Sequence, residues 1–191
     1  MLKSIGIECH FVLPWGHLAI GYLVYSLGNR LRTGVPPKGP AVIALAVGTQ
    51  FPDLIDKPLA WTFGILPSGR SLGHSLLFAV VLGAIVWTLR RQYNRRSAAG
   101  AFLIGHLSHV VADVLPAVRA TQWRQVGALL WPVVPVYQYP GELDHGILEF
   151  LLGLDLAALP LIGIVAGVLA LSLWVFDGLP GVRVVLDTIR S

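Results

Sequence analysis

Gly105-His106-Leu107-Ser108-His109-Val110-Val111-Ala112-Asp113 is the stretch that decides the fold. It lies in an apolar run, residues 97–115, which predicts a helix that Pro116 ends. At helical spacing His106, His109 and Asp113 share one face. His109 and Asp113 lie on adjacent turns, from which two side chains can reach one metal ion. Because an unpaired polar group is costly in apolar surroundings, we expect these side chains to have partners elsewhere in the chain.

The composition predicts a membrane protein. Of the 191 residues, 55% are hydrophobic and only 13% are charged, and the mean hydropathy is +0.71. A soluble domain carries about 25% charged residues. Cys9 is the single cysteine, which excludes an internal disulfide and a cysteine-rich zinc site. The net charge of +4 comes from arginines in short loops between apolar runs, so we assign it to membrane topology and not to nucleic-acid binding.

Long apolar runs predict an all-α fold, a polytopic membrane bundle of about five helices. The runs are residues 17–31, 41–55, 71–89, 97–115 and 142–176. The last one exceeds a single bilayer crossing, so we expect it to protrude or to bend near Pro160. Residues 116–141 should form an irregular or interfacial connection. The domain division is then a leader at 1–13, one membrane-embedded domain at 14–177 and a tail at 178–191.

Basic residues in the loops predict the orientation. The loops after the first and third runs hold Arg30, Arg32, Lys38, Arg90, Arg91, Arg95 and Arg96. The positive-inside rule places these loops in the cytoplasm and the N-terminus outside. Alternation of the runs then brings the main polar side chains to a similar depth at the outer face. These are His17, Asp53, Asp56, Arg70, His74 in the first turn of the third run, His109, Asp113, His145 and Glu149.

Their shared depth predicts a metal site. His145 and Glu149 repeat the spacing of His109 and Asp113, and imidazoles with carboxylates suit zinc or another divalent transition metal. The candidate ligands are His17, Asp53, His74, His109, Asp113, His145 and Glu149. Asp53 and Asp56 are candidates for bridging ions or for a general base, and Arg70 for holding a phosphate. His106 and Ser75 are candidates for supporting the ligands.

Structural roles compete with each of these assignments. A single histidine in an apolar run is commonly a packed core residue, and His106 suits a ligand, a supporting residue or packing equally well. Asp53 and Asp56 also suit a helix end before proline, and Arg70 suits an anchor at the membrane interface. Trp131 and the Tyr137/Tyr139 pair indicate an interfacial aromatic belt first, and a substrate groove second.

Several motifs, in this order along the chain, resemble the YdjM-like family of inner-membrane proteins, described as metal-dependent hydrolases. They are Pro14-Trp15-Gly16-His17, Pro52-Asp53-x-x-Asp56-Lys57-Pro58, Arg70-Ser71-x-x-His74-Ser75-Leu76-Leu77, Gly105-His106-Leu107-Ser108-His109-x-x-x-Asp113 and Leu130-Trp131-Pro132. The family typically shows Pro-Asp-x-Asp-His and His-Arg-x-x-Thr-His-Ser. Here the second aspartate, Asp56, comes one residue later, Lys57 replaces the histidine, and the second motif is shortened at Ser71 and Leu72. The ligand order is also similar to that of zinc-dependent phospholipase C and P1-type nuclease proteins, which implies zinc binding by the seven candidate ligands.

Residues and resemblance together predict a metal-dependent hydrolase of the inner membrane, with its site on the extracytoplasmic face. Bound zinc lowers the pKa of water from about 15.7 to about 7, which supplies hydroxide. A site at the interface suggests a lipid phosphoester or another amphipathic, phosphorylated substrate. One alternative is a metal or proton translocator, which needs ionisable groups across the full membrane; the apolar inner halves of the runs argue against it. The other is a non-catalytic membrane protein with a structural metal.

Overall fold

The structure, a computed structural model, describes residues 13–92, 96–138 and 161–190, and the regular elements in these ranges are all helical. The long helices are α1 (Pro14–Thr33), α2 (Gly39–Lys57), α3 (Leu76–Gln92), α4 (Arg96–Arg119) and α7 (Leu161–Phe176). The shorter elements are the π-helical turn η2 (Pro58–Thr62), α5 (Trp123–Val126), the 3-10 turn η3 (Gly127–Leu130) and α8 (Val182–Arg190). The prediction of an all-α fold is confirmed.

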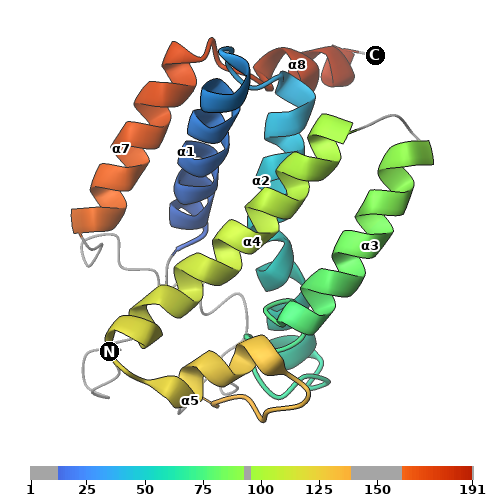
Figure 1. Cartoon of the computed structure of the whole chain (residues 1–191), viewed down its shortest axis with the longest axis vertical. Helices are drawn as coiled ribbons and strands as arrows, with labels where there is room; N and C mark the ends of the chain where they lie inside the picture. Colours follow the sequence, from blue (N-terminus) through green and yellow to red (C-terminus); the bar gives the residue numbers. More distant parts are fainter. Residues whose placement is uncertain (1–12, 93–95, 139–160, 191) are drawn as a thin grey trace.

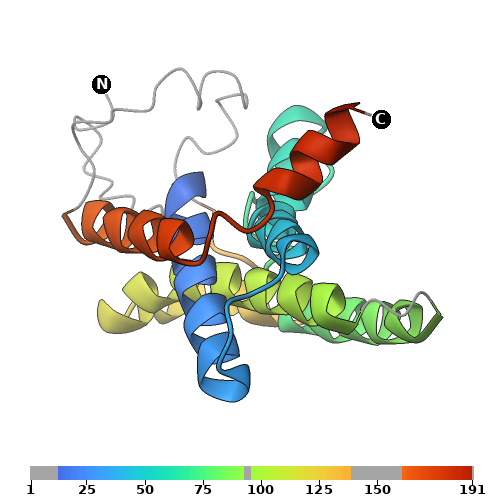
Figure 2. The same cartoon turned by 90° about the horizontal axis from the view of Figure 1, so that it is seen from above.

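The long helices alternate in direction along the chain (Figure 1). α1, α3 and α7 run toward the end of the molecule where α8 lies, and α2 and α4 run away from it. Seen from above, α4 extends across the molecule and α1 crosses it (Figure 2). The start of α1, the end of α2, the start of α3 and the second half of α4 therefore lie away from the α8 end. These segments, with the turn before α3, carry those predicted polar residues that lie in the described part of the chain.

α2 and α4 pack so closely that their backbones touch. A Cβ atom added to Gly48 of α2 would lie 2.2 Å from the carbonyl oxygen of Phe102, and one added to Gly105 of α4 would lie 2.5 Å from that of Leu45. Both positions therefore exclude any larger residue, as is common where small residues line a helix contact in membrane proteins. The fully buried Leu45 belongs to the core cluster beside this contact. The close approach fixes the distance between the polar groups on the two helices.

A buried carboxylate joins α1 to the end of α7. Tyr22, Ser26 and Arg30 lie on one face of α1, and all three donate hydrogen bonds to Asp177, the residue after α7. The Tyr22 hydroxyl lies 2.6 Å from Oδ2 and the Arg30 Nε 2.9 Å from Oδ1. The Asp177 side chain is fully buried. We call this group the Asp177 clasp.

α4 is the one helix of the described segments that is long and apolar enough to cross a membrane, and half of its most apolar window is buried inside the protein. The apolar part of α7, Gly163–Phe176, is shorter. Five crossings therefore remain a prediction.

Two local predictions are wrong. Pro116 does not end α4, which continues to Arg119; a proline inside a helix removes its own N–H bond and crowds the carbonyl one turn before it, which distorts a helix without always ending it. His74 does not lie in the first turn of a helix, because α3 begins at Leu76 and residues 71–75 form turns. The segment expected as a tail contains α8. The bend near Pro160 lies outside the described residues.

Candidate metal centre

Four side chains from three segments converge on one point. Asp53 comes from α2, His74 from the turn before α3, and His109 and Asp113 from α4; their ligand atoms all lie within 4.8 Å of one another. The His74 Nε2 lies 3.2 Å from the His109 Nε2 and 3.3 Å from the Asp113 Oδ2. The Asp53 Oδ1 lies 3.8 Å from the first nitrogen and 3.7 Å from the second. Ligands bonded at about 2.1 Å to a tetrahedral zinc ion lie about 3.4 Å apart, so the cluster fits such an ion.

The outer ring nitrogens of the two histidines fix which atoms face the cluster. The His109 Nδ1 lies 2.6 Å from the carbonyl oxygen of Thr49. A carbonyl can only accept, so Nδ1 carries the hydrogen and Nε2 of the neutral ring presents a lone pair. The His74 Nδ1 likewise lies 2.8 Å from the Asp56 Oδ2. Two lone pairs that face each other at 3.2 Å repel unless a proton or a metal ion lies between them.

Asp56 supports His74 from behind. Its side chain is fully buried. Besides the His74 contact, Oδ2 accepts a hydrogen bond from the Ser71 backbone N–H at 2.8 Å, and Oδ1 accepts one from that of Gly73 at 2.7 Å. A carboxylate that orients a metal-binding histidine is a common arrangement. Because both Asp56 oxygens are engaged in this way, the geometry favours a role in positioning His74 over a role in bridging two ions.

Basic side chains neutralise the ligand carboxylates. The Lys57 Nζ donates to the Asp53 Oδ2 at 2.5 Å, one helical turn away on α2. The Arg70 Nε lies 2.9 Å from the Asp113 Oδ2. Three carboxylates, including Asp56, thus face two basic groups, which leaves one excess negative charge when the histidines are neutral. A divalent cation is the partner that such an excess attracts.

The pKa of His74 depends on the neighbouring carboxylates. Burial alone would lower its pKa, but hydrogen bonds to Asp113 and Asp56 outweigh burial and raise the pKa of His74 to about 9. Asp113 is one of the four groups that would hold a metal ion in place of this proton, and Asp56 would orient the His74 ring from behind.

His17 borders the cluster. Its Nε2 lies 3.3 Å from the Asp113 Oδ1, and its ring stacks on that of His109 with the centroids 3.7 Å apart. The structure thus brings His17, Arg70 and Asp56 next to the four convergent side chains. His145 and Glu149, the other predicted ligands, lie outside the described residues, as does Tyr139.

The two predicted supporting residues have other contacts. His106 is fully buried beside the rings of Phe51 and Phe78, and neither ring nitrogen has a hydrogen-bond partner in the described part of the chain, so its described contacts are those of a packed side chain. The Ser75 Oγ accepts from the Leu77 N–H at the start of α3 and donates to the Trp131 carbonyl at 2.6 Å. Ser75 therefore ties the segment after η3 to the turn that carries His74.

Sequence reasoning missed the Thr49 carbonyl and the Ser71 and Gly73 N–H groups. All three are backbone groups, and no side-chain pattern marks them. Their positions depend on the contact of α2 with α4 and on the path of residues 68–75.

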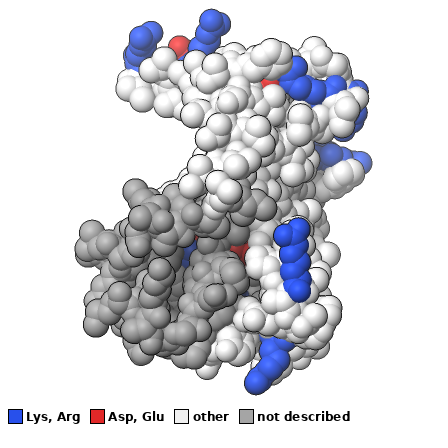
Figure 3. Space-filling model, turned by 90° about the vertical axis from the view of Figure 1, so that its left-hand side faces the viewer, with Lys and Arg blue, Asp and Glu red and all other residues white. Residues whose placement is uncertain are grey.

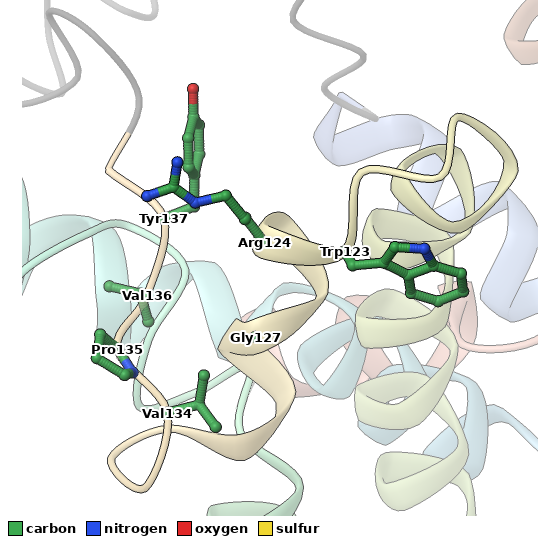
Figure 4. Close-up of a pocket in the computed structure, with 7 residues that line it drawn as sticks. All are labelled: Trp123, Arg124, Gly127, Val134, Pro135, Val136 and Tyr137. Carbon is green, nitrogen blue, oxygen red and sulfur yellow. The ribbon is translucent and has the colours of Figure 1, made fainter.

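A separate surface pocket of about 280 Å³ lies between α5 and the following extended segment (Figure 4). Its lining is mostly apolar and comprises Trp123, Arg124, Gly127, Val134, Pro135, Val136 and Tyr137. The Arg124 guanidinium lies 6.0 Å from the centre of the Tyr137 ring. None of the four convergent side chains lines this pocket, so the pocket is not part of the candidate metal centre.

Comparison with known proteins gives a family. Neither the curated proteins nor the solved structures contain a significant match to this chain. The model of the family described as YdjM inner membrane protein matches residues 13–176. This range contains the complete cluster and the α1–α4 scaffold that forms it, and on that evidence the chain belongs to the YdjM inner membrane protein family.

Proposed function

We propose that this chain is a membrane-bound, metal-dependent hydrolase that cleaves a phosphoester, with zinc as its metal. The observation that carries the proposal is the convergence of the His74 and His109 Nε2 atoms with the Asp53 and Asp113 carboxylates. Two nitrogen and two oxygen donors are a ligand set typical of zinc and other divalent transition metals. A zinc ion held here would supply hydroxide at neutral pH by lowering the pKa of water, which requires a coordination position open to water in addition to these four donors or in place of one of them.

The residues of the chain divide the remaining tasks. Asp53, His74, His109 and Asp113 hold the metal, and Asp56 and the Thr49 carbonyl orient the two imidazoles. Arg70, which already lies against Asp113, is placed to contact an anionic phosphate bound at the cluster. Lys57 balances the charge of Asp53. Membership of an inner-membrane family favours a lipid-borne or otherwise amphipathic substrate over a soluble one.

Metal analysis tests the first half of the proposal. The protein is purified in detergent as wild type, His74→Ala, His109→Ala and His106→Ala. His106 is the matched control, because it is a buried histidine one turn from His109 on α4 and lies outside the convergent group. We expect stoichiometric zinc in the wild type and in the folded His106→Ala protein, and its loss from the other two. A wild type that holds no metal after reloading would overturn the mechanism.

Activity tests the second half. The zinc-loaded and zinc-stripped proteins are assayed in mixed micelles with a short-chain phospholipid and with an aryl phosphodiester. Hydrolysis that needs zinc and falls in Arg70→Gln with zinc content unchanged supports the proposal. Full zinc content without hydrolysis of any phosphoester would favour a structural metal instead.

A further inference from the structure

α8 has two chemically distinct faces. Val182, Val185, Leu186 and Ile189 follow one another at helical spacing and form an apolar stripe. Arg183, Asp187 and Arg190 lie on the other side of the helix. A stripe of this kind indicates a helix that covers apolar material on one side and meets water on the other.

Three of the four stripe residues of α8 are exposed in the described part of the chain. Val185, Leu186 and Ile189 are 49%, 43% and 75% exposed. The helix is attached through a different side: it packs on α2, where a Cβ added to Gly39 would lie 3.0 Å from the Val184 side chain. Since Val184 lies on roughly the opposite side of α8 from the stripe, the contact with α2 through Val184 leaves the stripe uncovered by that helix.

The surroundings of α8 are basic. The ends of α1 and α3 and the starts of α2 and α4 lie at the same end of the molecule as α8 (Figure 1). These helix ends carry Arg30, Arg32, Lys38, Arg90, Arg91 and Arg96. On the face drawn in Figure 3, Lys and Arg side chains stand at both ends, with several at the upper end. Asp177 pairs with Arg30 in the clasp, so the other five basic residues provide the excess positive charge of these helix ends.

We propose that α8 lies in the surface of the membrane that holds the protein, with its apolar stripe in the lipid and its arginines bound to anionic lipid headgroups. α8 follows the apolar helix α7 after a short turn and runs at an angle to it, beside the start of α2 (Figures 1 and 2). A short amphipathic helix with arginines beside an apolar stripe is suited to the interface of an anionic bilayer. The basic helix ends around it meet the same charged surface. The role of α8 is then to fix the basic end of the bundle at the membrane surface.

Quenching of a fluorescent label tests the placement of the stripe. The full chain, with Cys9→Ala, receives one labelled cysteine, either Ile189→Cys on the stripe or Asp187→Cys on the polar side as the matched control. Each protein is placed in nanodiscs of phosphatidylcholine alone or mixed with phosphatidylglycerol. We expect the label at 189 to be quenched by brominated lipid and protected from iodide, and the label at 187 to show the reverse. Equal iodide access at both positions would overturn the proposal.

Charge variants test the headgroup contact. Arg183→Gln and Arg190→Gln should each lower the ratio of lipid-inserted to free α8 about fivefold in the anionic nanodiscs. Arg124→Gln, on α5 at the other end of the molecule, is the control and should leave the ratio unchanged. A label at 189 that is shielded from iodide and also from brominated lipid would show that another protein surface covers the stripe, which would refute the proposal. Insertion that is indifferent to phosphatidylglycerol and to both arginine variants would refute the headgroup contact.

Discussion

Asp56→Asn is the substitution that most directly tests how the candidate metal centre is built. The Asp56 carboxylate is not one of the four candidate ligands. It acts on the cluster through the His74 Nδ1, which lies 2.8 Å from its Oδ2. It also accepts the Ser71 and Gly73 N–H groups, one on each oxygen. Asparagine keeps the size of the side chain but replaces one acceptor by an NH₂ donor. One of the buried N–H groups must then face another donor.

Two effects follow, and their sizes differ. Loss of the carboxylate behind His74 should lower metal affinity about 10- to 100-fold, as for other partners of metal-binding histidines, which corresponds to roughly 1.4–2.7 kcal/mol. The unsatisfied buried donor should cost about 1–3 kcal/mol of stability in the metal-free protein. Asp53→Asn removes a ligand and should reduce affinity further.

The assay is a zinc titration against a competing chelator, together with thermal unfolding of the metal-free protein. Asp177→Asn is the matched control, because Asp177 is also a buried carboxylate with three donors but belongs to the clasp at the other end of α1. It should lower the unfolding temperature and leave zinc affinity unchanged in the folded fraction. If Asp56→Asn binds zinc as tightly as the wild type, Asp56 does not position His74 and the reasoning fails.

Two further predictions concern packing and pH. Gly105→Ala should destabilise the protein by about 1–3 kcal/mol, since its Cβ would meet the Leu45 carbonyl at 2.5 Å. Gly100→Ala on the same helix meets nothing within 4 Å and should stabilise the protein by up to about 1 kcal/mol. Thermal unfolding in detergent compares the two variants, and equal effects would contradict the backbone contact of α2 with α4. The pKa of His74 is raised to about 9, so its contribution to stability is fully present below the unfolded pKa of about 6.5 and is lost as the pH rises toward 9. Metal-free protein should therefore lose stability across this window, and zinc, which replaces the proton, should remove the dependence; a flat profile without metal would exclude a proton on His74.

The helical face that carries His109 and Asp113 could be predicted from spacing alone, because helical periodicity fixes which side chains meet. Alternation of the helices could be predicted from the succession of apolar runs, and it brings Asp53 and His74 to the same region. The position of Asp56 behind His74 could not be predicted, because it depends on how residues 68–75 fold back over α2. The extent of α4 differs from the prediction because a helix can accommodate an internal proline by a local distortion as well as by ending there.

α8 shows a different limit. Its apolar stripe is present in the sequence, but the segment is only nine residues long. A helix this short is marginal by itself and forms where packing or a surface supports it. Periodicity over so few residues is a weak signal beside the long apolar run that precedes it.

The Asp177 clasp also sets an order of events during synthesis. Arg30 and Asp177 are separated by 147 positions in the chain, so α1 leaves the ribosome long before its carboxylate partner exists. Until α7 has been made, Tyr22, Ser26 and Arg30 have to be satisfied by water, lipid headgroups or the insertion machinery. The clasp can close only when the segment from α1 to α7 is complete. A chain truncated before Asp177 would leave a cationic side chain on α1 without its buried partner, which is the kind of defect that membrane quality control can recognise.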